Sequence, residues 1–301
     1  MKKTNQIIGI VLTVISLFLI SYLIELINLN TLVKTLQNAD LKFIVVAIFF
    51  TLISLMLRTL RWKTLLDEKY KSDYFKILQI QTVGLALSNL SPGKVLEPSK
   101  LIPLKKEGVD YGFGLLTIFW ERALDLLVLF SFATLIIYKF DRIGADFFLI
   151  IFGLLLAIML TMYRNFNDVL KFLIRFKALS FLKNIEPHNF SFKTLLSTFI
   201  IANLVWASDA VSIYFVLLAF KININYFTII SSWSAAVLIG VASFLPGGLG
   251  SAEASMVYFL STSVFSITAL IAAVFVTRIV LNGTVLVLGI YWMPKIRKYF
   301  K

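Results

Sequence analysis

The sequence predicts an all-α, polytopic integral membrane protein with six spanning helices and two oppositely oriented re-entrant helical hairpins that form an inverted repeat. Three observations predict this class: the apolar composition, the length of the apolar segments, and two Pro-Gly stretches that interrupt the apolar pattern. Hydrophobic residues make up 59% of the 301 residues. A soluble domain cannot bury so much apolar surface, so we expect the chain to lie in a bilayer.

Six apolar segments reach the length of about 20 residues that a spanning helix needs. They are residues 7–27, 41–60, 113–138, 145–163, 194–220 and 266–292. The first segment follows Met1-Lys2-Lys3 and so resembles a signal peptide. Its apolar run is longer than a signal peptide requires and no small-residue cleavage site follows it, so we predict a helix that stays in the membrane.

Two further segments, 74–104 and 226–260, are each split by a Pro-Gly stretch. The chain has a net charge of +13. The distribution of its basic residues decides the topology of these two segments, because lysine and arginine near helix ends collect on the cytoplasmic side. If the N-terminus is cytoplasmic and each segment crosses the membrane once, the most basic loop, 164–193, lies outside. If each leaves by the side it entered, that loop lies inside. We therefore predict two re-entrant hairpins in a multi-pass plasma-membrane protein whose N- and C-termini are cytoplasmic.

The turns of the two hairpins are predicted at Pro92-Gly93 and at Pro246-Gly247-Gly248. Non-helical backbone at membrane depth is tolerated only where protein or water satisfies its free N–H and C=O groups. Helix ends at such turns also present partial charges that hold polar or ionic groups. We therefore expect the turns to line a polar cavity.

Equal spacing links the two hairpins. The interval along the chain from Glu97 to Arg122 is the same as the interval from Glu253 to Arg278. Each half therefore has a glutamate just after a hairpin turn and a spanning helix with a central arginine, and inverted repeats of this kind place a transport site at their interface. We expect one transmembrane domain over 1–301, divided into an N-terminal helix (1–40), a first repeat (41–138), a connecting helix with a basic cytoplasmic loop (145–193) and a second repeat (194–292).

Ionisable residues within the predicted membrane segments are the candidate substrate-binding residues. They are Lys94, Glu97, Arg122, Asp125, Asp209, Glu253 and Arg278. Glu121 is a further ionisable residue within a predicted span. Each costs about 2.5–3.5 kcal/mol when it faces lipid, so we expect them to face the interior of the bundle. Arg122 and Asp125 share a helix face. Two interpretations of this pair stay open: a structural ion pair, or part of a path for a charged headgroup.

Three residues near the end of the second predicted span are interpreted as border residues. Arg58 and Arg61 are expected to snorkel to the cytoplasmic surface, with a contact to lipid phosphate as the alternative. Trp62 is assigned to the aromatic belt at the membrane border.

Enzymatic signatures are absent from the sequence. It has no cysteine, and its single histidine, His188, cannot complete a zinc shell alone. Motifs of zinc proteases, serine hydrolases and phosphate-binding loops do not occur. We therefore predict no catalytic residue, metal or cofactor and no ATP site. The positive charge is explained by membrane topology, so no nucleic-acid partner is expected.

Five short motifs in order resemble the transmembrane region of lysylphosphatidylglycerol synthase/flippases and their stand-alone flippase-like relatives. They are Leu60-Arg61-Trp62, residues 91–98, Glu121-Arg122-x-x-Asp125, residues 245–253, and an arginine near the end followed by Tyr291-Trp292-Met293-Pro294. The resemblance covers nearly the whole chain. It implies a flippase-type domain that moves an anionic or aminoacylated phospholipid, or another amphiphile with a charged head, between leaflets. Because no aminoacyl-transferase domain and no catalytic motif is seen, we expect no enzymatic activity.

Two residues depart from the pattern of that family, which usually has Pro-Gly-Arg-x-Gly-Glu at the first turn. Lys94 replaces the arginine and lacks its bidentate fork, and Leu96 replaces a glycine.

Membrane lipids are the expected partners, and a homo-oligomer or a lipid-modifying enzyme partner stays open. The alternative functions are a membrane-embedded transferase acting on lipid-linked substrates and a non-catalytic partner subunit.

Overall fold

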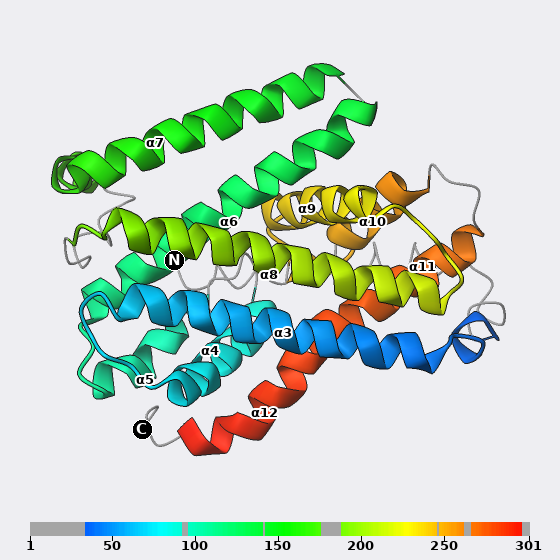
Figure 1. The fold of residues 1–301 in the computed structure, drawn as a ribbon, viewed down its shortest axis with the longest axis horizontal. Coiled ribbons are helices and arrows are strands. Elements are labelled where there is room, and N and C mark those ends of the chain that lie inside the picture. The colour runs from blue at the N-terminus through cyan, green and yellow to red at the C-terminus, as the bar shows by residue number, and fades with distance from the viewer. Residues whose placement is uncertain are drawn as a thin grey trace, which may run out of the picture.

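The computed structural model describes residues 34–91, 96–140, 142–175, 188–245, 247–261 and 266–296. The predicted span 7–27, the turn residues Pro92, Gly93 and Pro246, and the candidate site residue Lys94 lie outside these ranges. Every regular element in the described part of the chain is a helix (Figure 1). The predicted all-α class is therefore confirmed for these residues.

Five helical stretches are long and apolar enough to cross a membrane. They are α3 (Leu41–Leu66), α6 (Tyr111–Phe140), the apolar part of α7 (Arg142–Ile174), α8 (Phe192–Ala219), and α11 (Ile267–Arg278) continued through the π-turn η3 (Ile279–Gly283) into α12 (Thr284–Ile296). They coincide with the five predicted spans that fall within the described ranges. The protein is therefore a multi-pass membrane protein.

The segment after residue 163 differs from the prediction. The charge pattern predicts a loop there, but α7 continues to Ile174 with a kink at Asn165, whose backbone is non-helical at φ −131° and ψ 44°. Phe166, directly after the kink, is buried against the core. The helix thus bends at Asn165 and continues, with Phe166 packed into the core, where the charge pattern favoured a loop.

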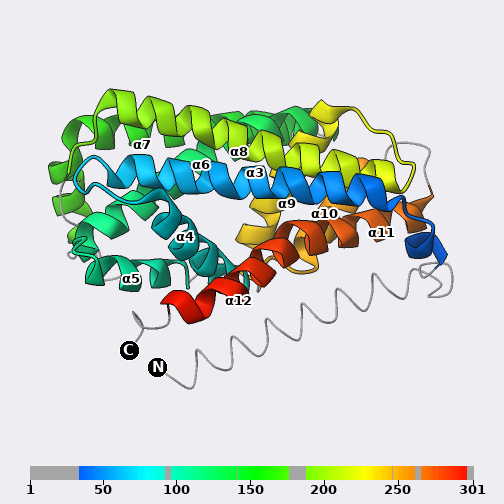
Figure 2. The same ribbon diagram turned by 60° about the horizontal axis from the view of Figure 1, so that its bottom comes forward.

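Short helices occupy the two predicted hairpin segments. The first segment holds α4 (Tyr74–Asn89), a 3-10 turn η1 (Glu97–Lys100) and α5 (Leu101–Lys106). The second holds α9 (Tyr226–Ala242) and α10 (Ser251–Leu260). The first group enters the bundle from one end and the second from the other (Figures 1 and 2). The two groups meet near the middle, where a Cβ atom at Gly247 would lie 2.8 Å from the carbonyl oxygen of Asn89.

Polar caps set where several helices begin. The side chains of Asp40, Asp73, Ser191, Asn225 and Ser266 each accept a hydrogen bond from a backbone N–H two or three residues later. Such caps satisfy donors that have no partner within the helix. The local sequence therefore determines these helix starts.

Helices α3 and α8 lie side by side and antiparallel at the centre of the molecule (Figure 1). The N–H of Asp40 donates to the carbonyl oxygen of Ala219 at 3.0 Å, which joins the start of α3 to the end of α8. Further along, the hydroxyls of Thr51 and Ser212 are 3.0 Å apart. Small polar side chains let membrane helices approach closely and hydrogen-bond to each other. This contact positions the two halves of the molecule against one another.

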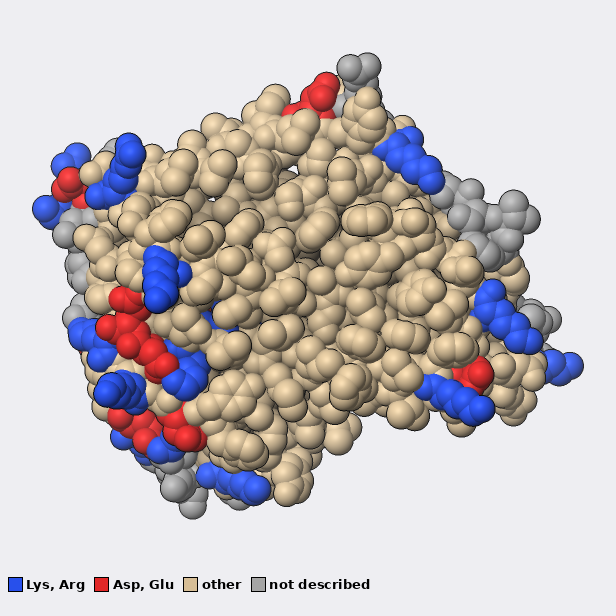
Figure 3. Space-filling model, in the orientation of Figure 1, with Lys and Arg blue, Asp and Glu red and all other residues tan. Residues whose placement is uncertain are grey.

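On the face shown in Figure 3, charged side chains gather at the two ends of the molecule, with a broad uncharged band between them. Large apolar side chains are exposed along α7, including Ile143 at 81%, Phe147 and Leu154. An apolar surface of this kind suits lipid and is not typical of a protein in water.

Candidate functional site

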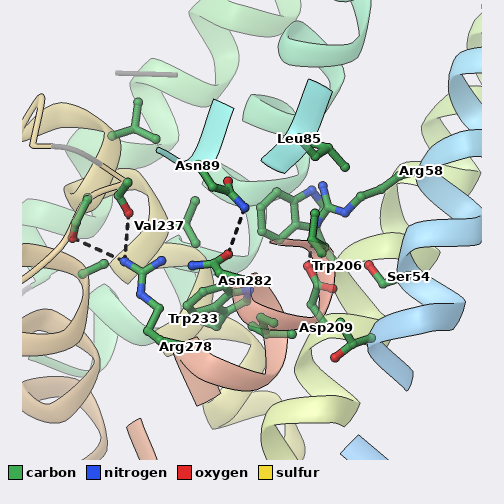
Figure 4. Close-up of a pocket in the computed structure, with 18 of the residues that line it drawn as sticks. Ser54, Arg58, Leu85, Asn89, Trp206, Asp209, Trp233, Val237, Arg278 and Asn282 are labelled. Atoms are coloured by element: carbon green, nitrogen blue, oxygen red, sulfur yellow. Dashed lines mark hydrogen bonds and ion pairs between the residues drawn. The ribbon is translucent and has the colours of Figure 1, made fainter. Parts of the chain in front are cut away.

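A cavity of about 110 Å³ lies where the two hairpin segments meet the central helices. Helices α3, α4, α8 and α9, the turn before α10, and the α11 to α12 segment all contribute to its walls (Figure 4). Its polar lining includes Arg58, Asp209, Arg278, Asn89 and Asn282. A single water needs only about 10–15 Å³, so the cavity holds several waters or one small polar group.

Arg278 lies on one wall of the cavity and is held by the second hairpin. Its Nη2 donates to the carbonyl oxygens of Gly247 at 3.1 Å and Gly248 at 3.3 Å. Its Nε donates to Glu253. The other carboxylate oxygen of Glu253 accepts the backbone N–H of Gly250 at 2.7 Å, at the start of α10. Glu253 thus joins the helix start to the arginine.

The turn that holds Arg278 needs glycine. Gly247 and Gly248 have φ values of 57° and 66°, in the left-handed region that other residues rarely adopt. Their carbonyl groups therefore point at the guanidinium instead of continuing a helix. The predicted turn role of these two glycines is consistent with this geometry.

Arg58 and Asp209 face the cavity from the two central helices. Nη2 of Arg58 lies 2.6 Å from Oδ2 of Asp209, and the two side chains are 16% and 8% exposed. The guanidinium also lies over the ring of Trp206, 5.2 Å from its centroid. Ion pairing and the cation–π contact together explain how an arginine is accommodated within the membrane.

Two asparagines bridge the cavity between the halves. Nδ2 of Asn89, at the end of α4, donates to Oδ1 of Asn282 at 3.2 Å (Figure 4). Asn282 lies in the π-turn η3, one helical turn after Arg278. Single π-turns within α-helices frequently mark functional positions because they change which side chains face inward.

A buried network of six charged side chains lies in the first half of the molecule, and Trp206 of the cavity wall donates a hydrogen bond to its Asp125 at 2.9 Å. Its cations are Arg61, Lys100 and Arg122, and its anions are Glu97, Glu121 and Asp125. Arg61 binds Asp125 through both terminal nitrogens, at 2.5 Å and 3.2 Å. Lys100 donates to Glu121 at 2.7 Å. The three positive and three negative charges balance.

The equally spaced pairs are both in contact. Arg122 lies 3.3 Å from Glu97, and Arg278 binds Glu253. Arg122 also lies 3.1 Å from Asp125. The predicted site residues nevertheless separate into two places, because Asp209 and Arg278 line the cavity while Glu97, Arg122 and Asp125 belong to the buried network.

Three residues that the sequence assigned to the membrane border lie inside the molecule, so those assignments were wrong. Arg61 and Trp62 are 0% exposed, and Arg58 turns inward to Asp209. The indole nitrogen of Trp62 donates to Thr117 at 3.0 Å. The predicted apolar segment ends at residue 60, whereas α3 continues to Leu66 and keeps these side chains within the bundle.

Lys100 was missed as a member of the buried network, whereas Glu121 was expected to face the interior of the bundle but was not among the candidate substrate-binding residues. Lys100 is 1% exposed, and its ammonium lies over the ring of Trp62, 4.1 Å from the centroid. The signal for Lys100 was present in the sequence, because Lys100 follows Glu97 by three residues. Its burial depends on how η1 packs against α4 and α6, which local spacing does not reveal.

The chemistry available at the cavity is ionic recognition. No group of three or more metal-ligating side chains occurs in the described part of the chain. Guanidinium groups bind phosphate and carboxylate through paired N–H donors, and asparagines supply further donors and acceptors. The arrangement is therefore suited to holding a charged group of modest size.

The sequence is similar to one protein family and to several known membrane proteins. Residues 6–289 match the model of the lysylphosphatidylglycerol synthase TM region. A UPF0104 membrane protein of Pyrococcus horikoshii is 25% identical over 80% of this chain and 83% of its own length. A UPF0104 membrane protein of Methanothermobacter thermautotrophicus is 24% identical over 95% of each chain. Another, of Methanocaldococcus jannaschii, is 22% identical over 87% of each.

Proposed function

The chain belongs to the family of the lysylphosphatidylglycerol synthase transmembrane region, and we propose that it moves an amphiphile with a charged headgroup between the leaflets of the membrane. The headgroup would cross through the polar cavity while the acyl chains stay in lipid. Membrane lipids are then its partners, and no enzymatic step is required. We place the protein in the plasma membrane, with both termini in the cytoplasm.

The observation that carries the proposal is the cavity itself. Arg58, Asp209 and Arg278 line it inside a bundle of apolar helices, where ionisable groups are costly unless they serve a pathway or pair with one another. An enzyme that acts on water-soluble substrates has no need for a charged cavity within the membrane. A passage for a charged headgroup needs one, because the headgroup must be shielded from the hydrocarbon.

The position of the cavity gives further support. We propose that the α4 to α5 and α9 to α10 segments are re-entrant hairpins of two inverted repeats. The approach of Gly247 to Asn89 brings their tips together beside the cavity. Transport sites in inverted-repeat proteins lie where broken helices meet near the middle of the membrane, with non-helical backbone facing the cavity.

The proposal is tested by lipid movement in proteoliposomes. Fluorescent phospholipids with different headgroups are placed in both leaflets, and an impermeant reductant bleaches those that reach the outer leaflet. Wild type is compared with Arg278→Ala, which removes a cavity cation, and with Arg164→Ala, which removes an exposed arginine on α7. We expect transfer by wild type and Arg164→Ala and its loss in folded Arg278→Ala.

The opposite result has a definite meaning. If folded wild-type protein moves none of the phospholipids above the rate of protein-free vesicles, lipid translocation by this chain alone is contradicted. The transferase and the partner-subunit functions then become the candidates to test. If Arg278→Ala is as active as wild type, the transport path does not use this cavity.

A further inference from the structure

The charges around the cavity balance, which restricts the headgroup that it accepts. Arg58 and Arg278 both line the cavity, and each is paired with a carboxylate, Asp209 and Glu253. The cavity therefore carries no surplus positive charge. A purely anionic headgroup would have to compete with these carboxylates, and it would bring nothing to replace the arginine that the carboxylate loses.

Asp209 is the carboxylate that such an exchange affects most directly, because it lines the same cavity as its partner Arg58. A phosphate that binds Arg58 offers the guanidinium acceptors equivalent to those of a carboxylate. Asp209, with a side chain only 8% exposed, would then be left without its cation. An unpaired buried charge is strongly unfavourable. The headgroup must therefore bring a positive group to Asp209.

The positive group must also donate a hydrogen bond. Arg58 supplies one to Oδ2 of Asp209 at 2.6 Å, and a buried acceptor that loses its donor is destabilised. A primary ammonium carries three N–H donors, whereas a quaternary ammonium carries none. The cavity of about 110 Å³ is smaller than the roughly 300–1,000 Å³ of sites for drug-sized ligands, so it suits a compact headgroup.

We infer that Asp209 selects a zwitterionic headgroup in which a phosphate carries a primary ammonium. Arg58 binds the phosphate, and Asp209 binds the ammonium that replaces Arg58 as its partner. The inference rests on the proposed function and names the substrate class of the same cavity. Asp209 thereby becomes a specificity-determining residue as well as the partner of Arg58.

The experiment compares phosphatidylethanolamine, phosphatidylcholine and phosphatidylglycerol with the same acyl-chain fluorophore in proteoliposomes. The first has the phosphate and primary ammonium, the second lacks N–H donors, and the third lacks a cation. We expect wild type to move phosphatidylethanolamine at least about tenfold faster than the other two, because a site built for a hydrogen-bonding group rejects analogues that lack it.

The matching variant is Asp209→Asn, which keeps the shape of the side chain and removes its charge. We expect this variant to lose the preference for phosphatidylethanolamine and to move phosphatidylglycerol at least as fast. Asp168→Asn is the control, because it makes the same change at a side chain that is 81% exposed on α7. It should keep the wild-type order of lipids.

Each outcome separates this inference from the proposed function. If wild type moves phosphatidylglycerol or phosphatidylcholine as fast as phosphatidylethanolamine, the headgroup inference is overturned while lipid translocation stands. A folded wild type that moves none of the three overturns both. If folded Asp209→Asn keeps the preference, Asp209 does not set it. Where this variant does not fold, the lipid order of wild type alone decides.

Water-soluble phosphoethanolamine shares the chemistry of the inferred headgroup. Its uptake into the same vesicles is therefore measured in parallel. Uptake of this compound without lipid transfer would support the headgroup chemistry and overturn lipid translocation. Lipid transfer without uptake supports a lipid substrate.

Discussion

Arg58 and Asp209 occupy the same position in two antiparallel helices and bind each other. Arg58 lies as far along the chain from Leu41, the first residue of α3, as Asp209 lies from Phe192, the first residue of α8. Their side chains meet at 2.6 Å. A two-fold relation between the halves of the chain would exchange α3 with α8, so the ion pair lies at the contact between two equivalent helices.

Packing of the other helices follows the same relation. Helix α4, before the first Pro-Gly turn, packs against α12, whereas α9, before the second, packs against α6. Exchanging the two halves converts one of these contacts into the other. This pattern supports the proposed inverted repeat, in which each hairpin packs on the spanning helix of the opposite half.

Reversing the Arg58 and Asp209 charges together should preserve more stability than reversing either one. Arg58→Asp or Asp209→Arg alone places two like charges in contact, and we expect a loss of about 3–5 kcal/mol, as for a broken buried pair. The double variant restores opposite charges but loses the contact with Trp206, so recovery should be partial. Thermal unfolding in detergent measures this. A double variant that unfolds at no higher temperature than the less stable of the two single variants would contradict the prediction.

Arg61 should be essential for folding. Arg61→Met removes the cation that binds Asp125 and Glu121 and leaves their charges poorly compensated, so we expect a loss of about 3–5 kcal/mol. Lys63→Met is the control, because its side chain is 23% exposed and pairs only at the surface with Asp67. It should change stability by about 0.5 kcal/mol or less. Equal melting temperatures for the two variants would refute the role of Arg61.

Glu253 combines two roles that different substitutions separate. Glu253→Gln keeps an oxygen that can accept the N–H of Gly250 but loses the charge that binds Arg278. Glu253→Ala loses both. We expect the alanine variant to be less stable than the glutamine variant by about 1 kcal/mol, the usual contribution of a helix cap. Thermal unfolding of both variants, with lipid transfer measured on each, checks this. Equal stabilities would show that the contact with Gly250 contributes little.

Close packing of α12 on α4 should depend on Gly289. A Cβ atom there would lie 2.6 Å from the Cβ of Ala86, so one helix must move. We expect Gly289→Ala to cost about 1–3 kcal/mol. Gly153→Ala on α7 is the control, since a Cβ atom there meets nothing within 4 Å. Unfolding in detergent should show no loss for Gly153→Ala. A Gly289→Ala protein as stable as wild type would mean that the two helices separate at little cost.

Stability should depend on acid through Glu68, which lies after α3 and outside the spanning segments. Burial raises the pKa of Glu68, but hydrogen bonds from Thr194 and Ser191 outweigh it and lower the pKa below the ordinary 4.5. A lowered pKa in the folded state stabilises the protein above about pH 4.5, and this contribution is lost as the pH falls through the folded value.

The measurement for Glu68 is the melting temperature of wild type and Glu68→Gln as a function of pH. We expect the variant to melt lower at pH 7 and the difference to shrink below about pH 4.5. Asp146→Asn is the control, because Asp146 is an exposed carboxylate near the start of α7. Its melting temperature should differ less from wild type at pH 7. A difference for Glu68→Gln that is independent of pH would show that charge is not the cause.

By itself, the sequence determined the membrane class and five spanning helices. It also determined where the first hairpin segment begins, at residue 74, and both bounds of the second, 226–260. These features follow from local properties: apolar length, capping side chains and Pro-Gly turns. The sequence also singled out Glu97, Arg122, Glu253 and Arg278, because the equal spacing within the two Glu–Arg pairs is visible without a structure. It indicated that these charges must avoid lipid.

Only the tertiary structure decided which charges meet. Arg61 looked like a border residue because the predicted apolar segment ends at residue 60, yet it is buried and bound to Asp125, 64 residues away. Arg58 and Asp209 come together because α3 and α8 pack antiparallel in one particular register. Helix rotation and register depend on the packing of both helices at once, so the sequence near either residue does not contain them. The cavity exists for the same reason, since it is formed where six separate segments meet.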